Sequence, residues 1–330
     1  FIFHPMASIL ITGGAGFIGS HIARALLDQG HDLVLVDNLD AYYPPAIKRR
    51  NLDLLRAAGD FTFAEGDAGD YRDLYELIRR HRVEVIFHQS ARPGIRQSLA
   101  DPQTTHRQNV VTTLHLLQAA IDQDVELFVN ASSSSVYGEA ASLPLEETQP
   151  PRPVSPYGVS KMAAEAYTRC YHTLYGLPTV SLRYFTVYGP RMRPDLAIFI
   201  FTRALLEGRR PVVFGDGEQK RDFTYIDDVV AANLAVLGRP PAGEVINIGY
   251  GSHVSVNHLL AMLGDLTGVD VAPLYRERVR GDVSDTWACV DKARRLLGWE
   301  PTTDLATGLR RFVDWYREAQ DFYAPLLAGY

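Results

Sequence analysis

A tyrosine and a lysine four positions apart carry the clearest chemical signal in this sequence. Tyr157 and Lys161 lie in the segment PVSPYGVSKMAAE, where Pro156 suits the first turn of a helix that continues for about five turns. Positions i and i+4 share one helix face, so the phenol and the ammonium should stand side by side. A neighbouring cation lowers the pKa of a tyrosine, which makes the pair a candidate acceptor for the proton of a substrate hydroxyl. The same spacing also occurs by chance on surface helices.

A serine cluster stands at a strand end where this helix should also arrive. The run ELFVNA leads into four consecutive serines, 132–135, and then into Val-Tyr-Gly. Such a cluster is usually a polar turn. At the end of a strand, however, the hydroxyl of Ser133 could hydrogen-bond the reacting oxygen and complete a Ser–Tyr–Lys set.

The start of the chain predicts a dinucleotide site. The apolar run 8–13, SILITG, is typical of a buried parallel strand and leads into a G-x-x-G-x-x-G loop. Such glycines let the backbone approach a pyrophosphate at the N-terminus of the next helix. The candidate cofactor residues of the loop are Gly13, Gly16, Phe17, Ile18 and Gly19. Asp37, followed by Asn38, ends the next strand (33–38) about 20 residues on, where a carboxylate binds an adenosine ribose and repels a 2′-phosphate. We expect NAD rather than NADP; a glycine turn with a capping aspartate is the alternative.

Strands and helices alternate through the first half of the chain. Helices are expected at 46–58, 70–81 and 101–122, and strands at 61–67, 83–91, 126–138 and 179–185. This alternation predicts a Rossmann-type, doubly wound parallel sheet, in which ligands bind at the carboxyl ends of the strands. The strand ends add the candidate cofactor residues Asp67, Ala68, Gln89, Ser90 and Ala91. Asp67 either contacts the adenine amino group or caps the helix at 70–81.

The pattern changes after residue 185. A loop broken by proline and glycine, TVYGPRMRPDL, carries Arg191 and Arg193, and later helices are expected at 196–207, 255–266, 291–297 and 304–319. Alternation is weaker there and the loops are longer. We predict an NAD-binding domain over residues 6–188, with a return to it near 226–250. A smaller α/β substrate-binding domain would comprise 189–225 and 251–330.

Composition excludes several classes of function. The net charge of −6, without a basic stripe, argues against a nucleic-acid partner. No apolar run approaches the about 20 residues that span a bilayer, and no secretory signal is apparent, so we expect a cytoplasmic protein with no membrane partner. Cys170 and Cys289 show no metal-ligand spacing, and neither a metal nor a disulfide is expected. Residues 1–5 fit no element, and we expect Met6 to be the natural start.

Together the motifs resemble the extended short-chain dehydrogenase/reductase family, specifically its NAD-dependent nucleotide-sugar epimerases and dehydratases. The resemblance rests on GGAGFIGSH, the VYG after the serines, SPYGVSK, LRYFTVYGPR, FGDGEQKRDFTYIDD, NIGYG and RGDVSDT. It implies that Tyr157 is the catalytic base, that Lys161 is its partner and a nicotinamide-ribose ligand, and that Ser133 is the hydroxyl partner. It also implies a homodimer, for which the helices at 101–122 and 157–175 are candidates.

Departures from the family pattern narrow the reaction. Sugar 4,6-dehydratases of the family resemble S-T-D-E-V-Y-G at the serine cluster, and uronate decarboxylases carry an acid near it; here Ser134 and Ser135 stand instead. This favours an isomerase that epimerises C4 of a UDP-sugar through a transient 4-keto intermediate. Thr186, Arg193 and Arg96 are similar to residues of UDP-glucuronate 4-epimerases.

The resemblance also assigns the substrate contacts. Arg193 would bind the C5 carboxylate as a fork, helped by Thr186 and by the serines at 134 and 135. Alternatively, Arg191 and Arg193 bind phosphate or pair with Asp195. The resemblance further places the diphosphate on Arg221 and Arg280 and the uridine ribose on Asp282, while Phe214 either walls the base pocket or belongs to the core.

Three other functions remain open at this point. The enzyme could be a UDP-glucose or UDP-N-acetylglucosamine 4-epimerase, with Arg193 on phosphate. It could be a UDP-glucuronate decarboxylase. A protein that binds NAD as a sensor, without catalysis, is the non-enzymatic alternative.

Overall fold

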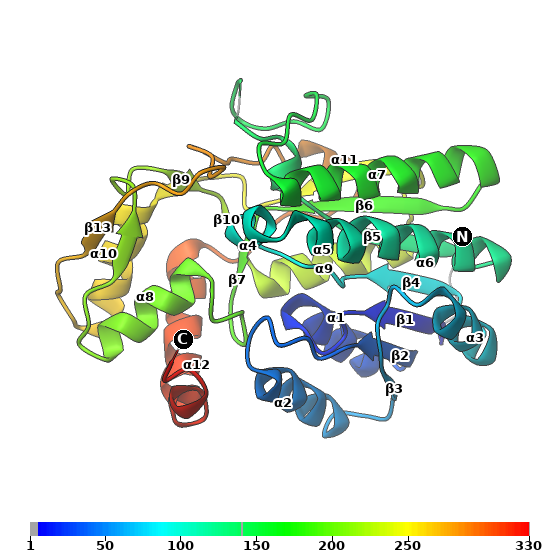
Figure 1. The fold of residues 1–330 in the computed structure, drawn as a ribbon, viewed down its shortest axis with the longest axis horizontal. Coiled ribbons are helices and arrows are strands. Elements are labelled where there is room, and N and C mark those ends of the chain that lie inside the picture. Colours follow the sequence, from blue (N-terminus) through cyan, green and yellow to red (C-terminus); the bar gives the residue numbers. More distant parts are fainter. Residues whose placement is uncertain (1–5, 140, 330) are drawn as a thin grey trace.

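The computed structural model describes residues 6–139 and 141–329. Its centre is a parallel sheet whose strands run in the order β11-β6-β5-β4-β1-β2-β3 (Figure 1). The strands are β1 (Ser8–Thr12), β2 (Asp32–Asp37), β3 (Thr62–Glu65), β4 (Val85–His88), β5 (Leu127–Ser133), β6 (Thr179–Tyr184) and β11 (Glu244–Ile248). The order reverses direction between β1 and β4, which is the switch point of a doubly wound sheet. The predicted Rossmann-type fold is therefore confirmed.

Helices cover both faces of this sheet because alternate strand residues point to opposite sides. In β1, Ile9 and Ile11 pack with the first group of helices, whereas Leu10 packs with the second. The first group is α1 (Phe17–Asp28), α2 (Pro45–Arg56), α9 (Ile226–Gly238) and α11 (Asp291–Leu297). The second group is α3 (Tyr71–His81), α6 (Thr112–Asp122) and α7 (Pro156–Tyr175). Strands buried on both sides read as continuous apolar runs, which is why the sequence located them.

The helix expected at 101–122 is interrupted, which the sequence did not predict. The structure has α4 (Ile95–Ala100), α5 (Pro102–His106), a π-helical segment (Arg107–Val111) and then α6. Within the π-helical segment, Asn109 accepts a hydrogen bond from the backbone N–H of Arg92 at 2.6 Å and donates to the Arg92 carbonyl at 3.1 Å. It also donates to Ser160 Oγ in α7 at 2.9 Å. The widened turn thus ties the loop after β4 to α7, beside the carboxyl ends of the strands.

The later elements gather beyond one end of the sheet (Figure 1). They comprise α8 (Ala197–Leu206), α10 (Val256–Thr267), α12 (Leu305–Leu326) and three short strand pairs. The pairs are β7 (Thr186–Tyr188) with β10 (Phe223–Tyr225), β8 (Val212–Phe214) with β13 (Leu274–Arg276), and β9 (Lys220–Arg221) with β12 (Val254–Ser255). Phe199 of α8 packs against Phe312, Tyr316 and Tyr323 of α12, which fastens these two helices together. The chain returns to the central sheet at β11, while the division into two domains stays a prediction.

Candidate active site

One cavity of about 210 Å³ opens at the carboxyl ends of the central strands. It reaches from the loop after β1 to α7, and its walls are lined by residues that follow β2, β3 and β4 and by residues near the end of β5. Every residue predicted to contact the cofactor lines it: Gly13, Gly16, Phe17, Ile18, Gly19, Asp37, Asn38, Asp67, Ala68, Gln89, Ser90, Ala91, Tyr157 and Lys161. The rule that ligands bind where parallel strands end therefore selected residues that share one cavity.

At two positions of the glycine loop, a side chain would collide with the backbone. Gly13 has φ +68°, and a Cβ atom there would lie 2.8 Å from the backbone nitrogen of Ser90. A Cβ atom on Gly19 would lie 2.2 Å from the carbonyl oxygen of Gly13. Gly16 is the N-cap of α1, and no side chain caps the first turn. A helix N-terminus with open N–H groups in a close-fitting glycine turn suits a pyrophosphate.

Asp37 is buried at the end of β2 and is held by three hydrogen bonds. Its Oδ1 accepts from the backbone N–H of Leu39 at 2.9 Å and from Lys48 Nζ at 3.2 Å, and its Oδ2 accepts from the backbone N–H of Ala15 at 3.2 Å. A carboxylate offers about four acceptor sites, so one is left for a ribose hydroxyl. The sequence did not point to Lys48, because three adjacent basic residues in α2, KRR, gave no reason to choose one.

The structure separates the two roles proposed for Asp67. The N-cap of α3 is Asp70, whose carboxylate accepts from the backbone N–H groups of Arg72 and Asp73. Asp67 lines the cavity, and its Oδ1 accepts from the backbone N–H of Gly69 at 2.8 Å. The helix-cap alternative for Asp67 is therefore wrong.

Tyr157 and Lys161 line the cavity, whereas Ser133 is not among the lining residues and acts on the Tyr157 hydroxyl as a hydrogen-bond partner from the end of β5. Lys161 is buried, and its Nζ donates to the carbonyl oxygen of Ala131 at 2.8 Å. Burial lowers the pKa of Lys161 to about 8, while the carboxylate of Glu165 opposes that change. Ser133 is buried at the end of β5 and caps the 3₁₀ turn Ser134–Val136 by accepting from the backbone N–H of Ser135 at 3.1 Å.

The pKa of Tyr157 differs from the sequence-based expectation. Burial raises the pKa of the phenol above its ordinary value, although a hydrogen bond from Ser133 and the positive charge of Arg193 act in the opposite direction. The expectation that Lys161 would bring this pKa below its ordinary value is therefore wrong. The physical reason is that removal of water from the phenolate outweighs the hydrogen bond of Ser133 and the charge of Arg193.

A buried ion pair between α7 and β6 also binds the serine cluster at the end of β5. Arg183 of β6 donates to Glu165 of α7 through Nε and Nη2, both at 2.8 Å. Glu165 also accepts from Ser132 Oγ at 2.5 Å, and the Arg183 guanidinium lies 4.6 Å from the ring centroid of Tyr137. The pair thereby links α7, β5 and β6 directly beneath the serine cluster.

Arg193 lines the cavity, but its nearest acid is Asp195. Arg193 Nε donates to Asp195 Oδ1 at 2.9 Å, and Nη2 donates to Oδ2 at 3.1 Å. The alternative in which this arginine pairs with Asp195 is therefore confirmed, except that the pair is largely buried rather than on the surface. Arg191 instead donates to Ser20 Oγ of α1 at 3.3 Å.

The other predicted substrate residues lie outside this cavity and form two contacts. Arg96 stacks on Phe214, with its guanidinium carbon 4.0 Å from the ring centroid. Phe214 is half-buried, so its assignment to the core is wrong. Arg221 donates to Asp282 at 2.6 Å, which pairs two residues expected on the nucleotide with each other. The remaining members are Thr186, half-buried in β7, the half-buried Ser134 and Ser135, and the exposed Arg280.

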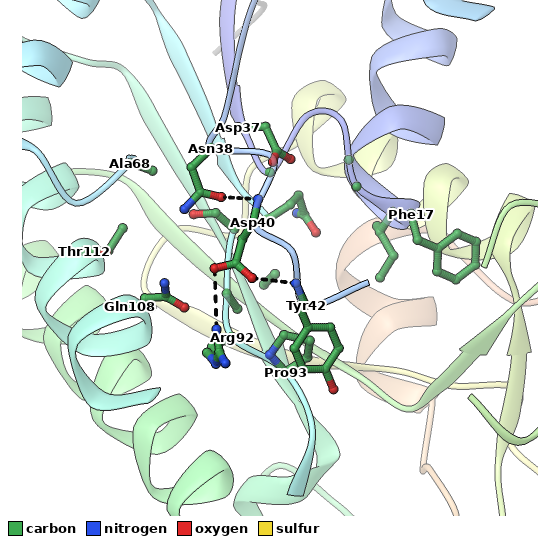
Figure 2. A pocket seen from close by; sticks show the side chains of 18 of the residues that line it. Phe17, Asp37, Asn38, Asp40, Tyr42, Ala68, Arg92, Pro93, Gln108 and Thr112 are labelled. Atoms are coloured by element: carbon green, nitrogen blue, oxygen red, sulfur yellow. Dashed lines mark hydrogen bonds and ion pairs between the residues drawn. The ribbon is translucent and has the colours of Figure 1, made fainter. Parts of the chain in front are cut away.

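Sequence reasoning missed the loops that close the opposite wall. Figure 2 shows Asp40 between Arg92 and Tyr42. Asp40 accepts from the backbone N–H of Tyr42 at 2.7 Å and from Arg92 Nη1 at 3.5 Å, so the loops after β2 and β4 face each other. Gln108 and Thr112 line the same wall. No sequence signal identified Asp40, Tyr42 and Arg92, because loops carry no periodicity, and nothing in the helix expected at 101–122 marked out Gln108 or Thr112.

Neither a metal-binding cluster nor a membrane-spanning helix occurs in the part of the chain that the structure describes. Within 6–139 and 141–329, no cluster of histidine, cysteine, aspartate or glutamate is placed to hold a metal. The helices in the same residues include none that is long and apolar enough to span a bilayer.

Comparison with known proteins identifies similar sequences and folds. The model of the NAD dependent epimerase/dehydratase family matches residues 9–249. A UDP-glucuronate 4-epimerase of Thermodesulfobacterium geofontis (strain OPF15) is 38% identical over 314 residues, which cover 95% of this chain and 97% of that protein. The structure of UDP-glucuronic acid 4-epimerase from Bacillus cereus, in complex with UDP-glucuronic acid and NAD, matches with a TM-score of 0.90 at 38% identity, covering 94% of this chain and 99% of that one. UDP-glucose 4-epimerase from Thermotoga maritima, with UDP-glucose, gives 0.89 at 36% identity, covering 95% and 99%.

Proposed function

Because the chain belongs to the NAD dependent epimerase/dehydratase family, we propose that it catalyses NAD-dependent 4-epimerisation of a UDP-sugar, with UDP-glucuronate as substrate and UDP-galacturonate as product. The observation that carries this proposal is the shared cavity. The glycine loop and Asp37 line one end, and Tyr157, Lys161 and Arg193 line the other. A cation at the sugar end is the group that a uronate needs.

The dinucleotide end of the cavity fits NAD. The glycine turn and the start of α1 would hold the pyrophosphate, Asp37 the adenosine ribose, and Lys161 the nicotinamide ribose. When bound, NAD accepts a hydride from C4 of the sugar and later returns it.

Tyr157 would move the proton that accompanies this hydride. The phenolate, which Ser133 and the positive charge of Arg193 favour against the effect of burial, takes the proton of the sugar 4-hydroxyl and gives it back after the 4-keto sugar has presented its other face. Ser134 and Ser135 stand where acids would be needed for loss of water, which supports epimerisation over dehydration.

Arg193 would have a second task with a uronate. A 4-keto uronate is a β-keto acid and loses CO₂ readily when its carboxylate bond aligns with the carbonyl π system. An arginine fork on the carboxylate would hold that bond out of alignment. Epimerisation without decarboxylation therefore depends on a fixed carboxylate.

The pairing of Arg193 with Asp195 favours a second candidate. Because Asp195 already balances the charge of Arg193, an uncharged hexose can occupy the sugar pocket without leaving that charge unpaired. UDP-glucose 4-epimerisation is therefore the alternative, and the similarity to the Thermotoga maritima enzyme supports it.

The test is to incubate purified protein with UDP-glucuronate, without added reductant, and to follow the products by NMR. UDP-galacturonate at a steady ratio is the expected result. UDP-pentose with CO₂ would replace the proposal by decarboxylation, and turnover of UDP-glucose alone would favour the second candidate. Arg193→Ala should lower uronate turnover or release UDP-pentose, whereas Arg24→Ala, which removes an exposed arginine of α1, should do neither.

A further inference from the structure

Asp195 joins Arg193 to the loop that follows β2. Its Oδ2 accepts one hydrogen bond from Arg193 Nη2 at 3.1 Å and another from the hydroxyl of Tyr42 at 2.9 Å. Tyr42 belongs to the segment that follows β2, far from Asp195 in the sequence. Only 20% of the Arg193 side chain and 23% of the Asp195 side chain are exposed, so solvent screens this pair weakly.

The ring of Tyr42 reinforces the arrangement. Its centroid lies 5.7 Å from the guanidinium carbon of Arg193 and also 5.7 Å from that of Arg92. A Cβ atom on Gly94 would lie 2.7 Å from the Tyr42 hydroxyl, so the loop after β4 also approaches this point closely. Tyr42, Arg92 and Arg193 all line the cavity. Three loops therefore converge on one hydroxyl and one carboxylate.

The chemistry of the guanidinium leaves room for a second acid. An arginine has five N–H donors, and the side-on pair with Asp195 uses the one on Nε and one of the two on Nη2. Both donors on Nη1 and the second on Nη2 are not used by this pair. A further carboxylate can therefore bind across Nη1 and Nη2 while Asp195 stays in place.

An arginine that must fix a small carboxylate gains from being held beforehand. A free arginine side chain has about 2 kcal/mol of rotamer entropy, part of which is lost when it binds. The bidentate pair, the Tyr42 hydroxyl and the stacked ring remove much of that freedom before substrate arrives. Burial would raise the pKa of Asp195, but Arg193 and Tyr42 outweigh it and hold that pKa below its usual range, so the carboxylate stays charged.

We propose that Asp195 is a positioning residue for Arg193, with Tyr42 as its second anchor, and that the two set the preference of this site for a sugar that carries a C5 carboxylate. This inference rests on the proposed function. Asp195 acts through Arg193 and touches neither the sugar nor the reacting atoms. Loss of the Asp195 carboxylate should therefore weaken the binding of a sugar carboxylate more than the binding of the nucleotide part of the substrate.

Two substrates that differ only at C6 test the inference. The NAD-loaded enzyme is assayed with UDP-glucuronate, and UDP-glucose is measured as a substrate or as a competitive inhibitor. Asp195→Asn should raise KM for UDP-glucuronate about tenfold, the loss of one hydrogen bond to a charged group, and should increase the share of UDP-pentose among the products. The KM for UDP-glucose, or its inhibition constant where it is not turned over, should change by less than about twofold. Tyr42→Phe keeps the ring and should give a smaller change in the same direction.

A double-mutant cycle separates positioning from a merely structural role. The quantity compared is the ratio of the KM for UDP-glucuronate to the constant for UDP-glucose. In an Arg193→Ala background, Asp195→Asn should not change this ratio any further. Glu207→Gln removes a surface partner of Arg203 in the same half of the chain and should leave that ratio as in the wild type. Thermal unfolding checks that each variant is folded. If Asp195→Asn does not fold, the same double-mutant cycle with Tyr42→Phe in its place decides the question.

The outcomes distinguish this inference from the proposed function. Equal weakening of both nucleotides by Asp195→Asn would overturn it, and so would a lower KM for UDP-glucuronate, which would make Asp195 a competitor of the substrate. A wild-type enzyme that converts UDP-glucuronate, with an Asp195→Asn variant that behaves identically, overturns this inference alone. A wild-type enzyme that does not convert UDP-glucuronate overturns both.

Discussion

The ammonium of Lys161 donates a hydrogen bond of 2.8 Å to the carbonyl oxygen of Ala131, two residues before Ser133 in the chain. This bond fastens the second turn of α7 to the end of β5. The bond therefore helps to set the separation between the candidate base on α7 and the serine on β5. Because the lysine is buried, its pKa falls to about 8, within reach of ordinary buffers.

Stability should depend on pH through Lys161. The folded-state pKa of about 8 lies below the ordinary lysine value of 10.5, so the charged form is disfavoured on folding. The destabilisation is complete below pH 8 and fades as pH rises toward 10.5. The stability advantage of Lys161→Met over wild type should shrink by roughly 3 kcal/mol between these limits, at about 1.4 kcal/mol per pKa unit. Urea unfolding of cofactor-free wild type and Lys161→Met at pH 7 and pH 10 measures this difference in the free energy of unfolding. A difference that is the same at both pH values would contradict the prediction.

Removing the phenol of Tyr157 should abolish most activity. Tyr157→Phe leaves the ring in place but removes the proton acceptor, and general base catalysis is typically worth about 10²- to 10⁴-fold. Turnover should fall by that order while bound NAD is retained, as measured by product NMR and by cofactor content after denaturation. Tyr167→Phe, on an exposed part of the same helix, is the matched control. A variant that keeps full turnover would require another base.

Breaking the buried pair between Glu165 and Arg183 should destabilise the fold strongly. Their side chains are only 7% and 4% exposed, so Glu165→Gln leaves an uncompensated buried guanidinium. A loss of about 3 kcal/mol or more in the free energy of unfolding is expected from urea titration. Asp291→Asn breaks an exposed arginine pair on α11 and should change little. Equal effects of the two substitutions would show that burial of the pair is unimportant.

Cofactor preference should respond to Asp37. Asp37→Asn removes the negative charge that opposes a 2′-phosphate and leaves Lys48 without its ion pair. The affinity for NADP relative to NAD should rise by roughly tenfold, equivalent to about 1.4 kcal/mol. Fluorescence titration with both dinucleotides measures the ratio, with Asp60→Asn, remote from the cavity, as control. An unchanged ratio would show that Asp37 does not discriminate.

The exposed face of α7 predicts a homodimer. Val159, Tyr167 and Leu174 are 47%, 38% and 67% exposed, and their spacing places them along one side of the helix. Val159→Glu would put charge into a packed interface and should convert a dimer into a monomer in light scattering after size exclusion. Leu54→Glu, on an equally exposed leucine of α2, should not. A wild-type protein that is monomeric at micromolar concentration would contradict the prediction.

Sequence reasoning worked where one local pattern decides the structure. The apolar run around Ile9 and Ile11 is buried on both faces of the sheet, so its strand could be recognised without knowing its neighbours. The rule for strand ends then placed Asp37 and Gln89 in one cavity. Pro156 and the helical pattern after it located α7 from its first to its last turn.

It failed where distant segments meet. Tyr42 and Asp195 are 153 residues apart, and no periodicity predicts that they share a hydrogen bond. The strand pairs of the second half have only two or three residues in each strand, too few for an alternating pattern. The pKa of Tyr157 depends on how much water the fold removes, which composition does not reveal.

The return of the chain at β11 constrains how this molecule can be recombined. Glu244–Ile248 pairs with β6 at the edge of the central sheet, after the chain has already built β7 through β10 beyond it. The elements beyond the central sheet are therefore not one continuous segment of the chain that could be exchanged as a unit. A chimaera with a single crossover after residue 188 would graft a foreign edge strand onto the native β6. Swapping sugar preference among relatives calls for loop grafts, with the loop that carries Arg193 and the segment that carries Tyr42 exchanged together.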